Sequence, residues 1–466
     1  MSITILGANG NQGEYEISNS ALFFGEGYLE RTPGTPTNAK KATISFWIRR
    51  ACEIGSNQTI ISWDSGGGSQ AYLRFANSSD NIQLFNDTAG ETDTSIITNL
   101  VVRDPAAWYH FVLTWDSAQG TASDRVKMYL NGTQITSFGT ANYPPQNTDF
   151  GLNVSGNAID LGRWAAGSEY LESYLADFYF IDGNCYDADT FGKTDSNGTW
   201  IPKNAGVTFG NNGFKLEFQQ TGTSANSSGI GADTSGNDNH LSVTDLGANC
   251  IMTESPNLTW ATLSDIAASD SQGAPGNIEN GGLRLPTGNK VHGLTLDNIM
   301  LDGGKWYWEV YMVTSNSFNS TLGFRNNDNG DDDPSIEVEN DRQVKKDSSN
   351  EGSSGGNFAN GAIIGIKLDW SNTASRKVTF LYNNGAMSDA GETTFRDTGT
   401  NSGFRYHGRE TGTGSVQLYN FGQSPGFFGN LSAGGNSDAN GYGDFQYAVP
   451  STYLSINSKN LATLGD

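Results

Sequence analysis

Hydrophobic and polar residues alternate in short runs along most of the chain, and glycine, asparagine, serine and threonine fill the intervals between them. In the run 42–49, for example, Ile44 would face a core while Arg49 faces the other way. A period of two is typical of a β-strand with one buried face. Since no stretch carries a long helical pattern, we predict an all-β protein with many short antiparallel strands.

Two similar stretches, 113–132 and 368–385, lie in opposite halves of the chain. Each has an apolar strand ending near a tryptophan, a polar interval, and an alternating strand that runs into an Asn-Gly pair. These pairs are Asn131-Gly132 and Asn384-Gly385. Asparagine and glycine tolerate the positive φ of tight hairpin turns, so Asn-Gly between strands predicts a β-hairpin. Two hairpins of one design predict two separate β-sandwich cores.

The rest of the pattern sets the expected boundaries. With 466 residues, the chain is long enough for two or three domains that each bury a core. We predict an N-terminal arm over residues 1–20 and antiparallel β-sandwiches of the jelly-roll type over 21–218 and 258–466. Residues 219–257 are rich in glycine, serine and asparagine and predict a connector between the sandwiches.

The charge and the cysteines narrow the class of protein. A net charge of −23 repels phosphate backbones and anionic membranes, which argues against nucleic-acid binding. No apolar run is long enough to insert into a membrane, and the N-terminus has no signal-peptide pattern. Cys52, Cys185 and Cys250 are odd in number and form no Cys-x-x-Cys motif, which favours reduced thiols in a protein made in a cytosol.

Residues 20–218 resemble a laminin G-like, concanavalin A-like jelly roll. The motifs that carry this resemblance are Ala42-Thr-Ile-Ser-Phe-Trp-Ile, Ala107-Trp-Tyr-His-Phe-Val, Lys127-Met-Tyr-Leu-Asn-Gly, and Leu161-Gly-Arg followed by Tyr174-Leu-Ala-Asp-Phe-Tyr-Phe-Ile-Asp-Gly. Residues 258–466 resemble a SPRY-type sandwich. Its motifs are Gly304-Lys-Trp-Tyr-Trp-Glu-Val, Gly365-Ile-Lys-Leu-Asp, Val378-Thr-Phe-Leu-Tyr-Asn-Asn-Gly and Val416-Gln-Leu-Tyr-Asn-Phe-Gly-Gln.

Further motifs resemble a two-domain protein type of tailed phages. They are Phe191-Gly-Lys-Thr-Asp, Gly198-Thr-Trp-Ile-Pro-Lys, Asn212-Gly-Phe-Lys-Leu-Glu-Phe and Asp233-Thr-Ser-Gly-Asn. The resemblance implies a virion surface protein such as a tail fibre, made in the host cytoplasm. It also implies other virion proteins and host surface glycan as partners, and a homo-oligomer on the particle.

Catalytic patterns are weak. The four histidines are scattered, and His110 lies within an apolar strand, where a packed residue is expected. Glycoside hydrolases need two carboxylates flanking the sugar bond. Glu337-Val-Glu339 with Asp341 is a close acidic alternation, and it lacks the Glu-x-Asp-x-x-Glu order of laminarinase-like enzymes. We therefore expect that the protein is not an enzyme.

We also expect an edge strand at residues 336–338, and a mobile Gly/Ser-rich loop at residues 348–360.

Calcium is a candidate cofactor, because hard cations bind several oxygen ligands and loops rich in Asp and Asn supply them. The best such loop is 327–333, where the candidate metal ligands are Asp328, Asp331, Asp332 and Asp333. Its spacing does not match the helix-flanked calcium loop. A solvated acidic loop is the alternative.

Sugar binding needs an aromatic plate for the CH face of the sugar and polar groups for its hydroxyls. In the first half the candidate residues are Trp63, Asp64, Arg163, Trp164 and Tyr170. In the second half they are Phe404, Arg405, Tyr406 and Arg409. The alternative for each aromatic residue is that it simply covers the sandwich.

Three functional hypotheses follow. The first is a non-enzymatic virion protein that binds host surface glycan or another virion protein through many weak contacts, which gain avidity on a symmetric particle. The second is a capsid or tail decoration protein without host recognition. The third is a polysaccharide-degrading enzyme, which ranks last because a fold alone confers no chemistry.

Overall fold

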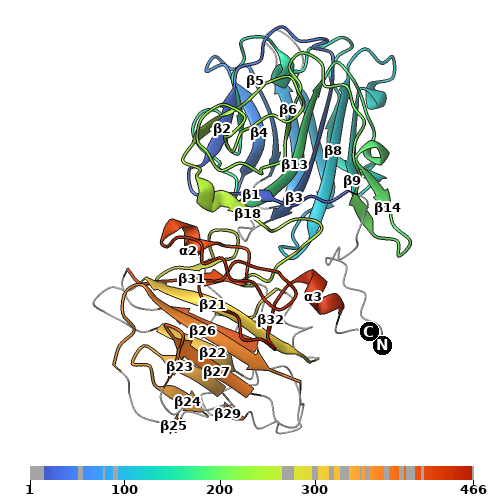
Figure 1. Cartoon of the computed structure of the whole chain (residues 1–466). Coiled ribbons are helices and arrows are strands. Elements are labelled where there is room, and N and C mark those ends of the chain that lie inside the picture. The colour runs from blue at the N-terminus through green and yellow to red at the C-terminus, as the bar shows by residue number, and fades with distance from the viewer. Residues whose placement is uncertain are drawn as a thin grey trace. The chain divides into compact units, whose positions relative to one another are not determined.

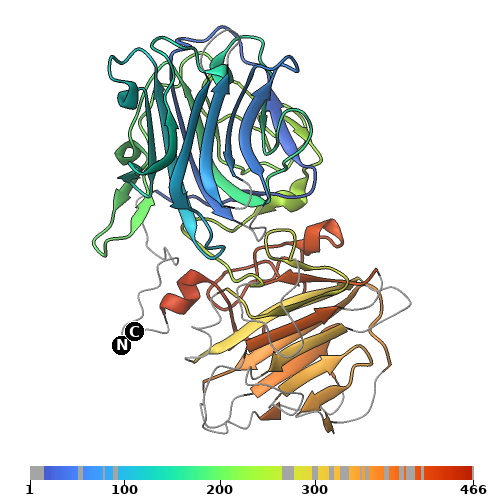
Figure 2. The same ribbon diagram turned by 180° about the vertical axis from the view of Figure 1, so that it is seen from behind.

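The computed structural model describes residues 15–50, 56–76, 79–87, 93–264, 278–295, 303–313, 320–325, 335–346, 349–351, 356–371, 377–387, 393–394, 405–410 and 414–463. The chain divides into two compact units, Met1–Leu258 and Thr259–Asp466 (Figures 1 and 2). Strands dominate both units, as the alternating pattern predicts. The short helical segments are η1 (Ala122–Asp124), η2 (Gly151–Asn153), η3 (Ala188–Thr190), η4 (Ala248–Cys250), α2 (Gly426–Gly429) and α3 (Ser458–Ala462). None of the helices in the described part of the chain has the length and apolar character needed to cross a membrane.

The first unit is a sandwich of two eight-stranded antiparallel sheets. Sheet A contains, in spatial order, β10 (Thr133–Gln134), β9 (Val126–Leu130), β8 (Trp108–Asp116), β3 (Lys41–Arg50), β13 (Ser173–Asp182), β1 (Ser20–Phe23) and β18 (Ile251–Met252), and β16 (Phe214–Leu216) also pairs with β13. Sheet B contains β11 (Phe138–Asn142), β7 (Thr94–Val101), β6 (Asn81–Asp87), β5 (Gln70–Phe75), β4 (Gln58–Asp64), β12 (Ile159–Leu161), β2 (Tyr28–Arg31) and β17 (Ser242–Thr244). Apolar side chains of both sheets form one core, which includes Ile44, Phe46, Leu73 and Leu84.

Strand β3 shows why sheet A differs from a half-exposed sheet. Ile44 faces the core as predicted, but Arg49 on the opposite face is also fully buried. The prediction of a single buried face is therefore wrong. The outer face of sheet A is covered by residues 184–209, which we call the covering segment. Its Phe191 packs into an apolar cluster with Val112 of β8 and Tyr179 of β13.

The covering segment includes a small two-stranded ribbon that docks on the predicted hairpin turn. The ribbon consists of β14 (Gly192–Thr194) and β15 (Trp200–Pro202). The turn between β9 and β10 consists of Asn131 at φ 46° and Gly132 at φ 80°, which confirms the Asn-Gly prediction. The Trp200 ring lies directly over Gly132, where a Cβ atom would overlap it.

The second predicted hairpin forms with a shifted turn. Strands β27 (Lys377–Tyr382) and β28 (Gly385–Ala386) are joined by Asn383 at φ 47° and Asn384 at φ 65°. Gly385 is therefore the first residue of β28 and not a turn residue. The two asparagines supply the positive φ values because their side chains tolerate the left-handed region.

Residues 219–257 are part of the first unit, so their description as a connector needs correction. Strand β17 pairs with β2, and β18 pairs with β1. Glu254 then inserts beneath sheet A, where Arg49 Nη1 binds its carboxylate at 2.8 Å and Trp108 Nε1 donates to it at 2.7 Å. Burial of these charges requires this pairing. The second unit begins at Thr259, close to the predicted 258.

The second unit also has two sheets. Sheet C contains β19 (Arg284–Leu285), β31 (Val416–Asn420), β21 (Lys305–Val313), β26 (Ala362–Asp369), β27 and β28, while β29 (Thr393–Thr394) pairs with β27 and β32 (Leu454–Ser455) runs parallel to β21. Sheet D contains β20 (Asn289–His292), β30 (Arg405–Glu410), β22 (Ser320–Arg325), β23 (Ser335–Glu339), β24 (Val344–Lys346) and β25 (Ser349–Glu351). The core holds Trp308, Phe324 and Trp370 in ring contact.

Two expectations for the second unit need correction. The strand predicted at an edge, β23, is interior because β22 and β24 flank it. The loop predicted at 348–360 contains β25, which lies at one edge of the described part of sheet D, with β20 at the other edge. The resemblance of this unit to a SPRY-type sandwich stays a prediction.

Replacement of Gly132 by alanine should destabilise the first unit by about 3 kcal/mol, because the new Cβ meets the Trp200 ring and the backbone is left-handed. Urea unfolding followed by tryptophan fluorescence measures the change. Gly120→Ala is the matched control, because a Cβ at Gly120 has open space around it. Equal stability of the two variants would show that the ribbon does not rest on this turn.

Replacement of Glu254 by alanine should cost about 3 kcal/mol, because it leaves the Arg49 guanidinium buried without its carboxylate. Thermal and urea unfolding check this. Glu26→Ala, at an exposed position, is the control and should change stability little. A Glu254→Ala protein as stable as this control would contradict the assignment of residues 219–257 to the first unit.

Candidate functional site

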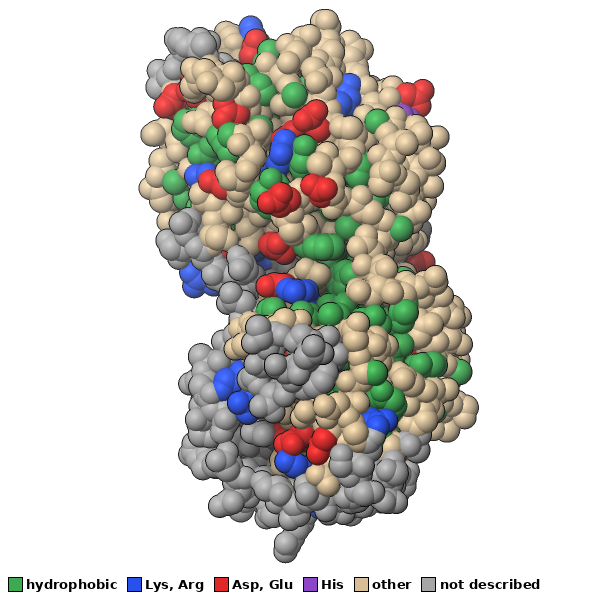
Figure 3. Space-filling model, turned by 90° about the vertical axis from the view of Figure 1, so that its left-hand side faces the viewer, with side chains coloured by type: hydrophobic (Ala, Val, Ile, Leu, Met, Phe, Trp, Pro, Cys, Tyr) green, Lys and Arg blue, Asp and Glu red, His purple; other side chains and the backbone are tan. Residues whose placement is uncertain are grey.

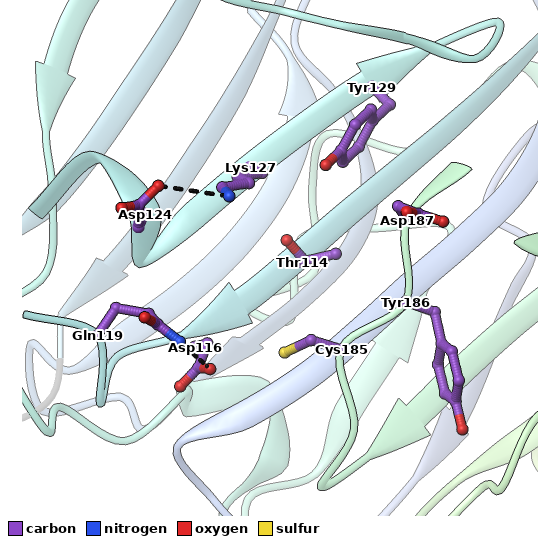
Figure 4. Close-up of a pocket in the computed structure, with 9 residues that line it drawn as sticks. All are labelled: Thr114, Asp116, Gln119, Asp124, Lys127, Tyr129, Cys185, Tyr186 and Asp187. Atoms are coloured by element: carbon purple, nitrogen blue, oxygen red, sulfur yellow. Dashed lines mark hydrogen bonds and ion pairs between the residues drawn. The ribbon is translucent and has the colours of Figure 1, made fainter. Parts of the chain in front are cut away.

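An open pocket lies on the outer side of sheet A, beside the start of the covering segment. Strands β8 and β9 form its floor, and Thr114 and Lys127 lie directly opposite each other in this strand pair. The chain after β13 forms its wall. The pocket has a volume of about 410 Å³ and is lined by Thr114, Asp116, Gln119, Asp124, Lys127, Tyr129, Cys185, Tyr186 and Asp187 (Figure 4).

The polar groups at one side of the pocket hold each other in place. Asp116 Oδ2 accepts a hydrogen bond from Gln119 Nε2 at 2.8 Å and lies 3.2 Å from Lys41 Nζ. Lys127 Nζ lies 3.3 Å from Asp124 Oδ1. These contacts fix the orientation of two carboxylates and one ammonium group around the opening. They are drawn as dashed lines in Figure 4 where both partners line the pocket.

The other side of the pocket is open to a ligand. Thr114 lies at the centre of the lining residues in Figure 4 and is only 8% exposed, and within the described residues its hydroxyl has no hydrogen-bond partner. Asp187 is exposed and accepts only a long bond, 3.4 Å, from Thr190 Oγ1. Burial raises the pKa of the Tyr129 phenol, Lys127 lowers it, and the charges of Asp187 and Asp189 raise it further. This side therefore combines a free hydroxyl, a carboxylate and an aromatic ring.

The pocket is not built for nucleophilic chemistry. The Cys185 thiol donates to the carbonyl oxygen of Trp115 at 3.2 Å. Burial, and secondarily the charge of Asp116, raises the pKa of this thiol to about 11. A thiol with a raised pKa carries little thiolate near neutral pH and is a poor nucleophile. Across the described residues there is also no group of three or more His, Cys, Asp or Glu side chains placed to hold a metal ion.

Of the residues predicted for sugar binding in the first half, Trp63 and Asp64 lie on β4 of sheet B. Arg163, Trp164 and Tyr170 lie in the segment that follows β12 of the same sheet. Trp164 contacts Tyr72 edge to face at 5.1 Å, and Tyr72 stacks on Phe85 at 5.2 Å. Strands β5 and β6, which carry Tyr72 and Phe85, lie to the left of β8 and β9 in Figure 1. Figure 3 views the molecule from that left-hand side and shows acidic, basic and hydrophobic side chains interspersed there.

The structure brings together some of these predicted residues but not all of them. Arg163 lies 3.4 Å above the Tyr28 ring, binds Asp160 at 2.7 Å and shares a hydrogen bond with Tyr170. Asp64 caps its own turn by accepting from the amide of Gly66 at 2.7 Å. Trp63 is 8% exposed and belongs to the core of the sandwich. It therefore packs in the sandwich, which was the alternative to sugar binding.

The predicted residues in the second half do not form a site in the described part of the chain. Tyr406 is 1% exposed, and its hydroxyl lies 3.0 Å from that of Tyr419, so it is a core residue out of reach of an external ligand. Arg405 and Arg409 lie on β30. Phe404 lies outside the described residues, as do the candidate calcium ligands Asp328, Asp331, Asp332 and Asp333.

The alternating acidic residues Glu337 and Glu339 of the second unit have structural surroundings. Glu337 is 4% exposed on the interior strand β23. Glu339 pairs with Lys345 of β24 at 2.7 Å. A cross-strand ion pair of this kind stabilises neighbouring strands.

Comparison with protein-family models finds one match, which lies within the first unit. Residues 24–184 match the family model of the concanavalin A-like lectin/glucanases superfamily. No curated protein sequence matches the chain.

Several solved structures are similar to this chain. A heptameric SAP-like pentraxin from Limulus polyphemus shares 15% identity at a TM-score of 0.28, covering 36% of this chain and 78% of its own. Domains LG4-5 of the mouse laminin α1 chain share 10% identity at a TM-score of 0.28, covering 88% and 84%. Tailspike protein 2 of the Escherichia coli O157:H7 bacteriophage CAB120 shares 16% at a TM-score of 0.26, covering 39% and 28%. Similarities at such low identity and TM-score carry no functional conclusion for this chain.

His110 is a packed core residue, as predicted. It is 1% exposed, its Nε2 lies 2.9 Å from Ser45 Oγ, and its Nδ1 accepts from Trp200 Nε1 at 3.1 Å. Burial lowers its pKa from the ordinary 6.5 to about 3. The ring is therefore neutral and fixed beneath the covering segment.

This buried histidine should make the first unit sensitive to acid. Between pH 6.5 and about 3 the unfolded chain binds a proton at His110 that the folded chain does not, so stability is full above pH 6.5 and falls as the pH decreases. The slope should approach about 1.4 kcal/mol per pH unit. Urea unfolding at several pH values should give a flatter dependence for His110→Gln, with His240→Gln as the control. An unchanged slope in His110→Gln would contradict this role.

Proposed function

We propose that this protein is a non-enzymatic glycan-binding protein that holds a sugar residue in the pocket between β8, β9 and the start of the covering segment. The observation that carries the proposal is the position of Thr114, a residue only 8% exposed, at the centre of a polar pocket of about 410 Å³. Its hydroxyl has no hydrogen-bond partner among the described residues. Ligand sites commonly have volumes of roughly 300–1,000 Å³ and place a few polar groups to fix orientation.

The chemistry of the lining suits a sugar. Each sugar hydroxyl both donates and accepts, and the pocket offers acceptors in its carboxylates, a donor in Lys127 and both in Thr114. Tyr129 and Tyr186 supply aromatic surface at its edge. Ion pairs to lysine occupy Asp116 and Asp124, and the Cys185 pKa is raised, so the described pocket favours binding over catalysis.

We further propose that the protein is displayed on the particle of a tailed phage, made in the host cytoplasm and assembled with other virion proteins as a homo-oligomer. The support is the order of sequence motifs that resemble such proteins. Copies on a symmetric particle would convert weak individual sites into strong adhesion to host glycan. The alternative is a decoration protein that binds only the particle. Antibody labelling of particles, with adsorption of the purified protein to host cells, separates these two roles.

Thr114→Val should weaken glycan binding roughly three- to tenfold, because one hydrogen bond to the ligand is lost while the shape of the side chain is kept. The assay is retention of the purified chain on immobilised bacterial surface polysaccharides, followed by titration with the one it binds.

Two control variants locate the site in this experiment. Thr133→Val makes the same chemical change at an exposed position on β10 and should bind normally. Trp164→Ala tests the aromatic cluster of sheet B. Loss of binding in Trp164→Ala together with normal binding in Thr114→Val would move the site to sheet B and overturn the pocket assignment.

A further inference from the structure

The pocket carries more negative than positive charge. Its lining contains three carboxylates, Asp116, Asp124 and Asp187, against one ammonium group, Lys127. Lys41 offsets Asp116 from outside the pocket and Lys127 offsets Asp124. Within the described residues no lysine or arginine pairs with Asp187, and its one hydrogen bond is the long contact with Thr190. The uncompensated charge therefore lies at the open side.

Geometry restricts the kind of cation that could bind beside Asp187. A metal ion needs several ligands converging on one point. The described residues contain no group of three acidic, histidine or cysteine side chains that could converge in this way. An organic ammonium group has weaker demands, since it can contact one carboxylate, a hydroxyl and the face of an aromatic ring.

The positions of two side chains are consistent with such a cation. Tyr129 and Asp187 lie on the same side of the pocket in Figure 4. Thr114 lies between them and the paired carboxylates, and the residue is only 8% exposed, with no hydrogen-bond partner for its hydroxyl among the described residues. A ligand that reaches Thr114 with a hydroxyl group would extend its neighbouring substituent toward Asp187.

We infer that the pocket prefers a sugar residue that carries a free protonated amino group, with the ammonium group beside Asp187 and Tyr129 and a sugar hydroxyl on Thr114. This inference rests on the proposed glycan-binding function and specifies its ligand class. An N-acetylated sugar lacks the charge, and a uronic acid would add a fourth carboxylate to the pocket.

The test is a titration of the full chain, followed by NMR, with four methyl glycosides: glucosaminide, N-acetylglucosaminide, glucoside and glucuronide. We expect the glucosaminide to bind at least about fivefold more tightly than the N-acetylglucosaminide and the glucoside. One partly exposed ion pair strengthens binding by about this factor. The glucuronide should bind most weakly. Raising the salt concentration should reduce the preference.

Asp187→Asn should abolish most of the preference for the glucosaminide. Asp238→Asn makes the same change at a side chain that is 91% exposed outside the pocket, and it should keep the preference. Equal binding of the glucosaminide and the glucoside by the native chain would overturn the amino-sugar inference and leave glycan binding intact. No binding of any glycoside, together with no retention on surface polysaccharide, would overturn both proposals.

Discussion

The burial of both faces of sheet A is the constraint on which the first unit depends. An eight-stranded sheet with Arg49, Trp108 and His110 on its outer face cannot leave that face in water without losing the packing of these groups. The chain therefore returns to cover it. Residues 184–209 place Trp200 over His110, and the segment before Leu258 places Glu254 against Arg49. The candidate pocket lies at the start of this covering segment, which contributes Cys185, Tyr186 and Asp187 to its lining.

The all-β architecture, the two cores and the hairpin at Asn131-Gly132 were predictable because local residue types dictate them. Alternation fixes strands, and a positive φ selects asparagine and glycine. The second turn was placed one residue late, since Asn383 and Asn384 satisfy the same need as Asn-Gly. The role of residues 219–257 was missed because a Gly- and Ser-rich composition does not reveal a single buried carboxylate such as Glu254.

The pocket itself was not predictable from the sequence. Its residues come from two stretches, 114–129 and 185–187, that the pairing of β13, β3 and β8 brings together. Asp187 and Thr114 belong to no motif, and their proximity follows from tertiary structure. The search for aromatic residues beside polar ones selected Trp63 and Tyr406 instead. Both side chains are buried in a core, which explains why they are aromatic. Counting aromatic residues finds cores more readily than it finds ligand sites.

The position of Trp200 over Gly132 has a consequence for the order of folding. The β8–β9–β10 region is local in sequence and can close quickly, whereas the covering segment must return over a longer loop. The ribbon that carries Trp200 can dock only after the turn has formed its flat glycine surface. We therefore expect the floor of the pocket to form early and its wall late, so that a newly made chain would complete this candidate site only in the last steps of folding.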